Sequence, residues 1–232
     1  METQGAEPYF GHDKTVGMYK IFKNRTEAAK LLVEKLKKRD TTNAVVLAVP
    51  RGGVPVGYEI AKALHLPLDI FLSKKIGHPY NPEYAIGSVT LEGAVLNGRA
   101  ANIDLKYIKA QTEKIREQLR ERYKKFRGDR PPPDVSGKTV ILTDDGVATG
   151  NTLFAAIDDL RKKAPAKIIV AVAVSPPETA KKLRRLADEL ICLYTPDDFY
   201  GVGQYYDDFS QVEDTEVMAL LAKAADTVEV NE

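Results

Sequence analysis

The chain has 232 residues, of which 44% are hydrophobic and 29% charged, so it is long enough for one substantial α/β domain with an appended element. Its formal net charge of +1 gives no overall attraction to nucleic acid or to a membrane surface, and we expect neither as a partner. The single cysteine, Cys192, excludes an internal disulfide framework. Because the chain has neither an apolar leader nor about 18 consecutive apolar residues, we expect a cytoplasmic protein.

The first part of the chain alternates between helical and strand patterns after a polar lead-in over residues 1–18. Asn24 is a helix N-cap, and the apolar residues that follow it recur at helical intervals. Ala44 to Val49 is an unbroken apolar run, which is typical of a strand covered on both faces. The segment Pro50 to Pro55 interrupts this pattern, and Tyr58 to His65 is predicted to be a helix.

The middle of the chain contains two further strands and one long helix. We predict strands at Leu68 to Leu72 and, more weakly, at Ala85 to Leu91. Between them lies Ser73 to Glu83, whose prolines and glycine predict a loop of functional rather than connecting length. Asp104 to Phe126 is a long amphipathic helix, which Arg130 to Pro133 brings to an end.

The same alternation continues toward the C-terminus. Lys138 to Thr143 and Lys167 to Val174 are predicted strands, separated by a helix from about Asn151 to Lys163. A helix starting near Pro176 and a strand through Ile191 complete the pattern. Repeated strand–helix alternation predicts an α/β fold with a mainly parallel, twisted sheet flanked by helices.

Three regions follow from these patterns. Residues 1–18 are the lead-in, and residues 19–195 form the α/β core, with a long helical insertion at 104–126. Residues 196–232 form an aromatic, acidic tail that closes with a short helix around Thr215 to Ala224.

The segment Val140 to Thr152 carries the strongest functional signal. A buried strand ends in two adjacent carboxylates, and a loop of small residues then opens a helix. Such a loop lets successive backbone N–H groups converge on one phosphate, and the helix start favours negative charge. Thr149 and Thr152 add hydroxyl donors. Asp144-Asp145-Gly146 alone is more typical of a simple turn, but the ordered combination favours a phosphate site.

The two carboxylates indicate which phosphate compound fits. Carboxylates facing a phosphate would repel it, whereas carboxylates one step along the ligand can accept hydrogen bonds from sugar hydroxyls. A ribose 5-phosphate satisfies that arrangement. The lysine-containing loop that binds nucleotide triphosphates is absent from the sequence.

Val140 to Thr152 resembles the signature of type I phosphoribosyltransferases, which bind 5-phosphoribosyl-1-pyrophosphate (PRPP). The resemblance implies that fold, with a small hood formed by the C-terminal tail. It also implies that Asp144 and Asp145 bind the ribose hydroxyls. It further implies that the 5′-phosphate is bound by the loop and the start of the helix, which are formed by Gly146, Val147, Ala148, Thr149, Gly150, Asn151 and Thr152.

Two other segments resemble the rest of such a site. Arg51, Gly52 and Gly53 follow the first core strand, where the family places its pyrophosphate loop; read alone, this tripeptide is a common turn. Lys74 and Lys75 lie where the family carries a mobile flap, and with Arg51 they are our candidate catalytic residues. Solvated lysines at a strand end are the alternative.

The whole chain is similar to a bacterial and archaeal group of phosphoribosyltransferases with no assigned acceptor. The resemblance implies transfer of phosphoribosyl from PRPP to a nitrogenous, nucleobase-like acceptor, with Mg²⁺ held mainly by PRPP, and a homodimer. The histidines His12, His65 and His78 are scattered, so we expect no metal cage of side chains. A PRPP-binding regulator without catalysis is the alternative function.

The acceptor is the least defined part of this prediction. Members that act on 6-oxopurines have an acid immediately before the Thr-Gly pair, but here that residue is Ala148, which cannot transfer a proton. We expect the acceptor to contact aromatic residues of the tail: Phe199, Tyr205, Tyr206 and Phe209. The alternative is that these rings anchor the tail on the domain.

Overall fold

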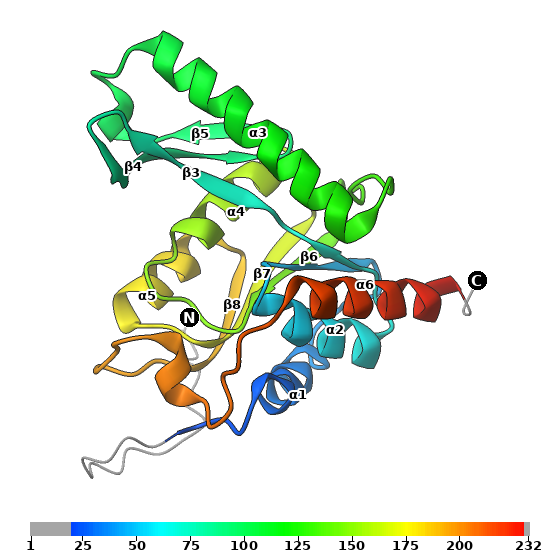
Figure 1. Cartoon of the computed structure of the whole chain (residues 1–232). Helices are drawn as coiled ribbons and strands as arrows, with labels where there is room; N and C mark the ends of the chain where they lie inside the picture. Colours follow the sequence, from blue (N-terminus) through cyan, green and yellow to red (C-terminus); the bar gives the residue numbers. More distant parts are fainter. Residues whose placement is uncertain (1–19, 230–232) are drawn as a thin grey trace.

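The computed structural model describes residues 20–229, so the predicted lead-in lies outside the described residues. At its centre is a parallel sheet with the strand order β2-β1-β6-β7-β8 (Figure 1). The strands are β1 (Ala44–Ala48), β2 (Leu68–Ile70), β6 (Thr139–Asp144), β7 (Lys167–Val174) and β8 (Glu189–Tyr194). The predicted fold class is confirmed.

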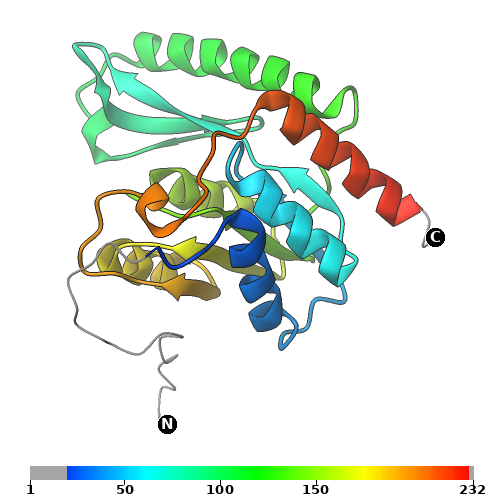
Figure 2. The ribbon, with the colours of Figure 1, turned by 60° about the horizontal axis from the view of Figure 1, so that its bottom comes forward.

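Helices cover both faces of this sheet (Figures 1 and 2). On one face lie α1 (Arg25–Leu36), α2 (Gly53–Leu64) and α6 (Asp214–Glu229), and on the other α4 (Asn151–Arg161) and α5 (Pro177–Leu186). Because neighbouring strand residues point to opposite faces, Val46 and Ala48 join the first layer, while Val45 and Leu47 join the second. The wholly apolar β1 therefore fills both layers.

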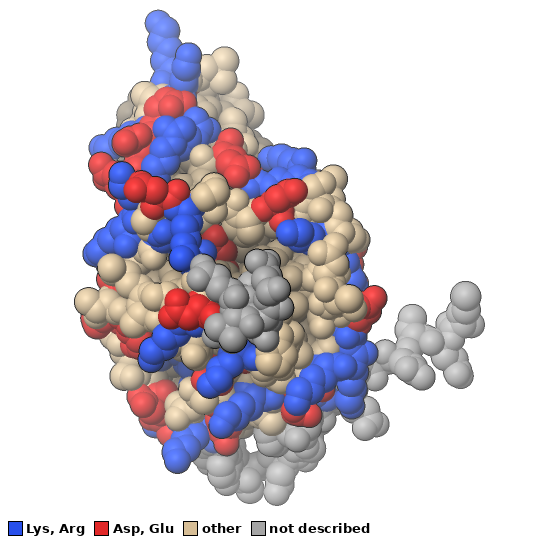
Figure 3. All heavy atoms as spheres, turned by 90° about the vertical axis from the view of Figure 1, so that its right-hand side faces the viewer, with Lys and Arg blue, Asp and Glu red and all other residues tan. Residues whose placement is uncertain are grey.

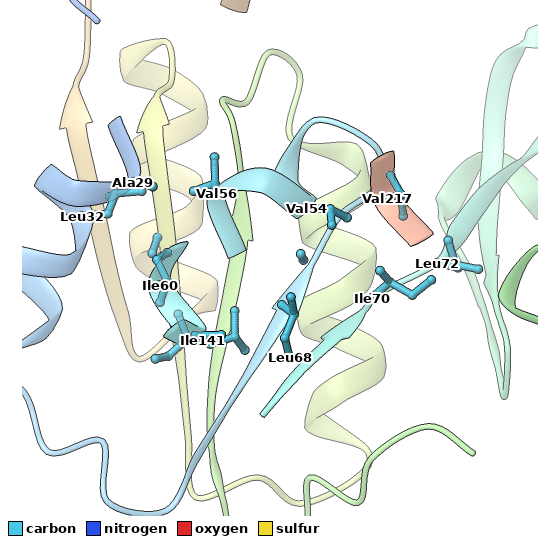
Figure 4. Packing of buried hydrophobic residues seen from close by; sticks show 14 of the residues in the cluster. Ala29, Leu32, Val54, Val56, Ile60, Leu68, Ile70, Leu72, Ile141 and Val217 are labelled. Carbon is cyan, nitrogen blue, oxygen red and sulfur yellow. The ribbon is translucent and has the colours of Figure 1, made fainter. Parts of the chain in front are cut away.

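The first layer is a continuous buried cluster (Figure 4). Ile60 of α2 and Leu32 of α1 are fully buried in it, and Val54 packs in the same cluster as Val217 of α6. The helix α2 begins at Gly53, earlier than the predicted start at Tyr58. That prediction was wrong because Pro55 stands in the first turn of the helix, where a missing N–H costs nothing.

A second unit lies beside the main sheet. It consists of an antiparallel sheet of β3 (Ser73–His78), β4 (Asn81–Thr90) and β5 (Ala94–Leu96), a short 3₁₀ helix η1 (Gly98–Ala100), and the long helix α3 (Leu105–Arg127), which lies across the strands in Figure 1. The helix matches the predicted range to within one residue at each end.

The prediction of a loop over Ser73 to Glu83 was wrong, because this segment is a β-hairpin. Its proline and glycine residues occupy positions that do not break the strands. Pro79 lies in the turn, and the register shifts around Gly77. A side chain at Gly77 would meet the Pro82 carbonyl oxygen at 2.5 Å, so the close pairing requires glycine there.

A buried polar network joins the second unit to the main sheet. Asp69 of β2 is 2% exposed and accepts a hydrogen bond of 2.7 Å from the Tyr123 hydroxyl. Arg127, the last residue of α3, makes an ion pair of 3.1 Å with the same carboxylate. Both partners therefore fix the C-terminal end of α3 against the sheet edge.

The C-terminal tail crosses the carboxyl end of the main sheet (Figures 1 and 2). It contains a short 3₁₀ helix, η2 (Val202–Tyr205), and then α6, which is longer than the predicted Thr215 to Ala224. The Tyr205 carbonyl accepts hydrogen bonds from the Ile21 and Phe22 amides, so the tail lies beside the chain that leads into α1.

The distribution of surface charges agrees with the small net charge of the chain. Acidic and basic side chains are both spread over the face in Figure 3. Within residues 20–229, no helix has the length and hydropathy needed to cross a membrane.

Candidate functional site

The candidate site lies where β1 and β6 end side by side. The two strands pair in parallel up to Ala48 and Thr143, so the residues that follow each strand meet at the same edge. The Val49 amide donates to the Thr143 carbonyl at 2.9 Å, and the peptide bond between Pro50 and Arg51 is cis. The structure thus brings together two motifs that lie far apart in the chain.

Two glycines make this approach possible. A side chain at Gly52 would overlap the carboxylate of Asp145, with its first carbon 2.7 Å from Cγ. At Gly53 the corresponding atom would lie 2.9 Å from the Thr143 carbonyl oxygen. The backbone after β1 therefore packs directly against the acid pair, which explains why glycines occupy both positions.

The acid pair consists of two carboxyls in different surroundings. Asp144 is partly exposed, and its Oδ1 accepts a hydrogen bond of 2.8 Å from the Asp145 amide. Asp145 is 7% exposed, and its main-chain carbonyl accepts a hydrogen bond of 2.6 Å from the Tyr206 hydroxyl. The two carboxyls are therefore held by different groups, although both are shielded from water.

The pKa values of the pair are shifted by the same surroundings. Desolvation raises the pKa of Asp144 well above its usual range, and the neighbouring Asp145 charge raises it further. Desolvation also raises the pKa of Asp145, while the Arg25 guanidinium lowers it. Of the two, Asp145 has the better-compensated negative charge.

Arg25 is a residue of this site that the sequence did not indicate. It is the first residue of α1, and its Nε donates to Asp145 Oδ2 at 2.8 Å. Its Nη1 donates to the Ser210 carbonyl at 2.8 Å, and the Phe209 ring lies 4.0 Å from the guanidinium carbon. No motif marks Arg25, because its partners are 120 and 185 residues away in the chain.

The predicted phosphate loop is fixed on its inner side. The Val147 amide donates to the Val174 carbonyl at 2.8 Å, and the Thr179 hydroxyl donates to the Ala148 carbonyl at 2.8 Å. Gly150 caps α4 with a φ of 77°, a conformation that favours glycine. The loop is therefore tied to β7 and to α5.

The outer side of the loop is open to solvent. Ala148, Thr149, Asn151 and Thr152 are exposed, and no side chain caps the start of α4. The first turn of a helix leaves backbone amides without intrahelical partners. This loop and helix start can therefore donate several hydrogen bonds to one anion.

Arg51 lies at the same edge of the sheet and binds acidic residues of the tail. Its Nη1 lies 3.5 Å from a carboxylate oxygen of Glu213 and 3.7 Å from one of Asp214. The Arg51 side chain is 32% exposed. These partners lie at or just before the start of α6. Arg51 therefore pairs with carboxylate groups in this structure.

Lys74 and Lys75 are not joined to this constellation by any described contact. Lys74 Nζ donates to Gln118 of α3 at 2.8 Å, and Lys75 makes an ion pair of 2.6 Å with Glu83 across the hairpin. Both are exposed on β3. Their observed contacts correspond to the alternative of solvated lysines on a strand.

The aromatic residues of the tail form a packed cluster. Tyr206 is 1% exposed and stacks on Phe209 at 5.0 Å between ring centroids; Tyr205 is 5% exposed and stacks on Phe199 at 5.7 Å. The predicted acceptor role for Tyr205 and Tyr206 conflicts with this burial, because neither ring has a free face. These two tyrosines anchor the tail on the domain. Phe199 and Phe209 are only partly buried.

The fold and this site define a phosphoribosyl transferase domain. Residues 18–210 match the family model of that domain, and the chain belongs to this family. The resemblance to type I phosphoribosyltransferases is confirmed, as is their fold.

Two relatives illustrate the match. A Mycobacterium tuberculosis protein with a provisional phosphoribosyl transferase name is 37% identical over 209 residues, covering 88% of this chain. The match covers 47% of that protein, so this chain spans about half the length of the curated relatives it matches. The crystal structure of TT1426 from Thermus thermophilus is 39% identical, with a TM-score of 0.79 over 87% of this chain and 98% of that chain.

Proposed function

We propose that the protein transfers the 5-phosphoribosyl group of PRPP to a nitrogenous acceptor and releases pyrophosphate. The observation that carries this proposal is the contact of Gly52 with Asp145, which joins the backbone beside Arg51 to the acid pair. A ligand with a phosphate at one end, a sugar diol in the middle and a pyrophosphate at the other end would use all three parts of this edge.

Each part of PRPP has a proposed partner. The 5′-phosphate would bind the amides and hydroxyls from Gly146 to Thr152, at the exposed start of α4. The ribose hydroxyls would donate to Asp144 and Asp145. The pyrophosphate would bind Arg51 and the amides of Gly52 and Gly53, replacing the Glu213 and Asp214 carboxylates on the arginine.

The proposed reaction is displacement at ribose C1. The nitrogen of the acceptor forms the new bond to C1 while the bond from C1 to the pyrophosphate oxygen breaks, and the electron pair leaves with the pyrophosphate. Because the sugar is cation-like in the transition state, the protein's part is to align the reactants and stabilise the departing anion. Arg51 is our candidate for that second task. Lys74 and Lys75 remain candidates only if the hairpin changes position.

Mg²⁺ fits this site as an ion carried by the substrate. In residues 20–229 no group of three or more histidine, cysteine or acidic side chains could hold a metal. Mg²⁺ takes oxygen ligands, and the phosphate and ribose oxygens of PRPP would supply them. Bound to PRPP, the ion would supply charge neutralisation on the pyrophosphate.

We place the acceptor beside η2. A side chain at Gly146 would meet Val202 at 2.5 Å, so Val202 stands directly over the start of the phosphate loop. Val202 and Phe199 are both partly exposed, unlike Tyr205 and Tyr206. With Ala148 at the position of a proton-transferring acid, the acceptor nitrogen would need a proton acceptor from elsewhere.

The test is a panel of nucleobases and related amines incubated with PRPP and Mg²⁺ and assayed for pyrophosphate release. We expect release with at least one acceptor, and none from the double variant Asp144→Asn/Asp145→Asn, which should also lose PRPP binding in calorimetry. Unchanged PRPP affinity in that variant would refute the ribose assignment. PRPP binding by the wild type without release from any acceptor would instead favour a PRPP-binding regulator.

We also expect a homodimer, by resemblance to the family. Light scattering on the purified chain measures its mass in solution, and a monomer over the working concentration range would refute this expectation.

A further inference from the structure

Arg25 connects three separate parts of the chain at one carboxylate. It lies at the start of α1, contacts Asp145 after β6, and binds Phe209 and Ser210 of the tail. The Arg25 side chain is 11% exposed and that of Asp145 is 10% exposed, so the pair is largely shielded from water. Such a pair is stable only when its geometry is well satisfied.

The position of Arg25 distinguishes it from an ordinary ion pair of the domain. Arg39 and Glu189 form a comparable, partly buried pair at 2.6 Å, but neither residue lies at the carboxyl end of the sheet. The partner of Arg25 is instead one of the two acids of the candidate sugar site. A change at Arg25 therefore acts on that site directly.

The surroundings of Asp145 leave its carboxylate few other orientations. Gly52 packs against it on one side, and the Tyr206 hydroxyl holds the adjacent main-chain carbonyl on another. Arg25 takes up Oδ2 with a charged hydrogen bond. Because the guanidinium is itself fixed by Ser210 and Phe209, the direction of this bond is set from two elements at once.

The charges around Asp145 favour the same role. The charged or titratable groups that face it are Arg25 from α1, Asp144 from β6 and the Tyr206 hydroxyl from the tail. Of these, only Arg25 is positive. Without it, two desolvated carboxyls would share one site with no compensating charge, and protonation of both would become easier.

We propose that Arg25 is a positioning residue of the sugar site, which holds Asp145 as an ionised acceptor for the ribose hydroxyls. Through Phe209 and Ser210 it also makes the C-terminal tail a structural part of that site. This inference rests on the proposed function, because it assigns the diol to the acid pair.

The test compares PRPP binding by Arg25→Gln, Arg25→Lys and wild type, measured by calorimetry with Mg²⁺ from about pH 5 to pH 9. PRPP binding should weaken toward low pH as the acid pair becomes protonated, and we call this part of the pH profile the acidic limb. An adjacent arginine lowers a carboxyl pKa by about 1–3 units, so the loss of Arg25 should shift the acidic limb to higher pH by a similar interval. At pH 6 we expect Arg25→Gln to bind PRPP at least about ten-fold more weakly than wild type. Arg25→Lys keeps the charge and should restore the position of the limb, though not the full affinity.

Arg39→Gln is the matched control, because it removes a partly buried ion pair of similar geometry away from the sheet edge. It should leave the acidic limb unchanged, whatever its effect on stability. A folded Arg25→Gln protein with the wild-type affinity and pH dependence would overturn the role of Arg25. Binding of neither PRPP nor ribose 5-phosphate by the wild type would instead overturn the proposed function.

If Arg25→Gln does not fold, Arg25→Lys and the wild type still decide the question. Lysine keeps the positive charge but lacks the planar fork that also donates to the Ser210 carbonyl, so we expect Arg25→Lys to bind PRPP more weakly than the wild type at pH 8. Wild-type affinity in a folded Arg25→Lys protein would overturn the proposal.

Discussion

The substitution Gly52→Ala tests the contact that joins the two halves of the proposed site. The added methyl carbon would lie 2.7 Å from Asp145 Cγ and would overlap the nearer carboxylate oxygen. Asp145 cannot simply rotate away, because Arg25 holds its Oδ2 at 2.8 Å and Tyr206 holds its main chain. Either the backbone after β1 must shift, or the Arg25–Asp145 hydrogen bond must break.

The loss of stability can be estimated from these two structural adjustments. Overpacking a fitted contact costs about 1–3 kcal/mol. Loss of a hydrogen bond to a charged group costs about 1.5–3 kcal/mol. With partial relaxation, we expect Gly52→Ala to lower the free energy of unfolding by about 2–4 kcal/mol, and to weaken PRPP binding by more than about ten-fold.

The assay is chemical denaturation together with calorimetric titration of PRPP and Mg²⁺. Gly98→Ala is the matched control, since a methyl group at Gly98 meets nothing within 4 Å. It should change the free energy of unfolding by less than about 0.5 kcal/mol and leave PRPP binding intact. If Gly52→Ala were as stable as Gly98→Ala and bound PRPP like the wild type, the inferred contact between the two motifs would be wrong.

Two further predictions concern stability. Asp69→Ala leaves the Tyr123 hydroxyl and the Arg127 guanidinium without their buried partner, and should cost about 3–5 kcal/mol in chemical denaturation. Asp158→Ala, which removes an exposed pair with Lys162, should cost less than about 1 kcal/mol; similar costs for both would contradict the role of the network. For Asp144, the folded-state pKa lies above the unfolded one, so the folded state holds the proton more tightly and its stability declines as the pH rises from about 4 through that pKa. Asp144→Asn should therefore stabilise the ligand-free protein at neutral pH and flatten the decline that begins at about pH 4, and an unchanged pH profile would refute this.

The parts of the fold that the sequence predicted are those with strong local patterns. The apolar runs at β1, β6 and β7 mark strands buried on both faces, and the long stripe of α3 marks one helix. The hairpin of β3 and β4 has a weaker pattern, because Lys74 and Lys75 are both exposed and the buried Ile76 stands alone among polar neighbours. The hairpin packs against α3, a contact that no local pattern reveals.

In the candidate site, too, only the residues that form a local sequence pattern were predicted. The acid pair and the phosphate loop are contiguous in the chain, so their order alone predicted them. Arg25 could not be found, since its contacts arise only when α1 and the tail meet Asp145. The burial of Tyr206 was equally invisible, because an aromatic residue in an irregular segment can stack on a ligand or on Phe22 with the same local sequence.

The long separations at Arg25 also bear on how the protein is made. A nascent chain that ends before residue 206 contains all the strands of the main sheet, but neither the Tyr206 hydroxyl nor the Ser210 carbonyl. Until those residues leave the ribosome, Asp145 and Arg25 have an open side toward solvent. The last portion to be translated therefore completes the surroundings of Asp145 and adds α6 to the core, and a chain cut short there would lose both.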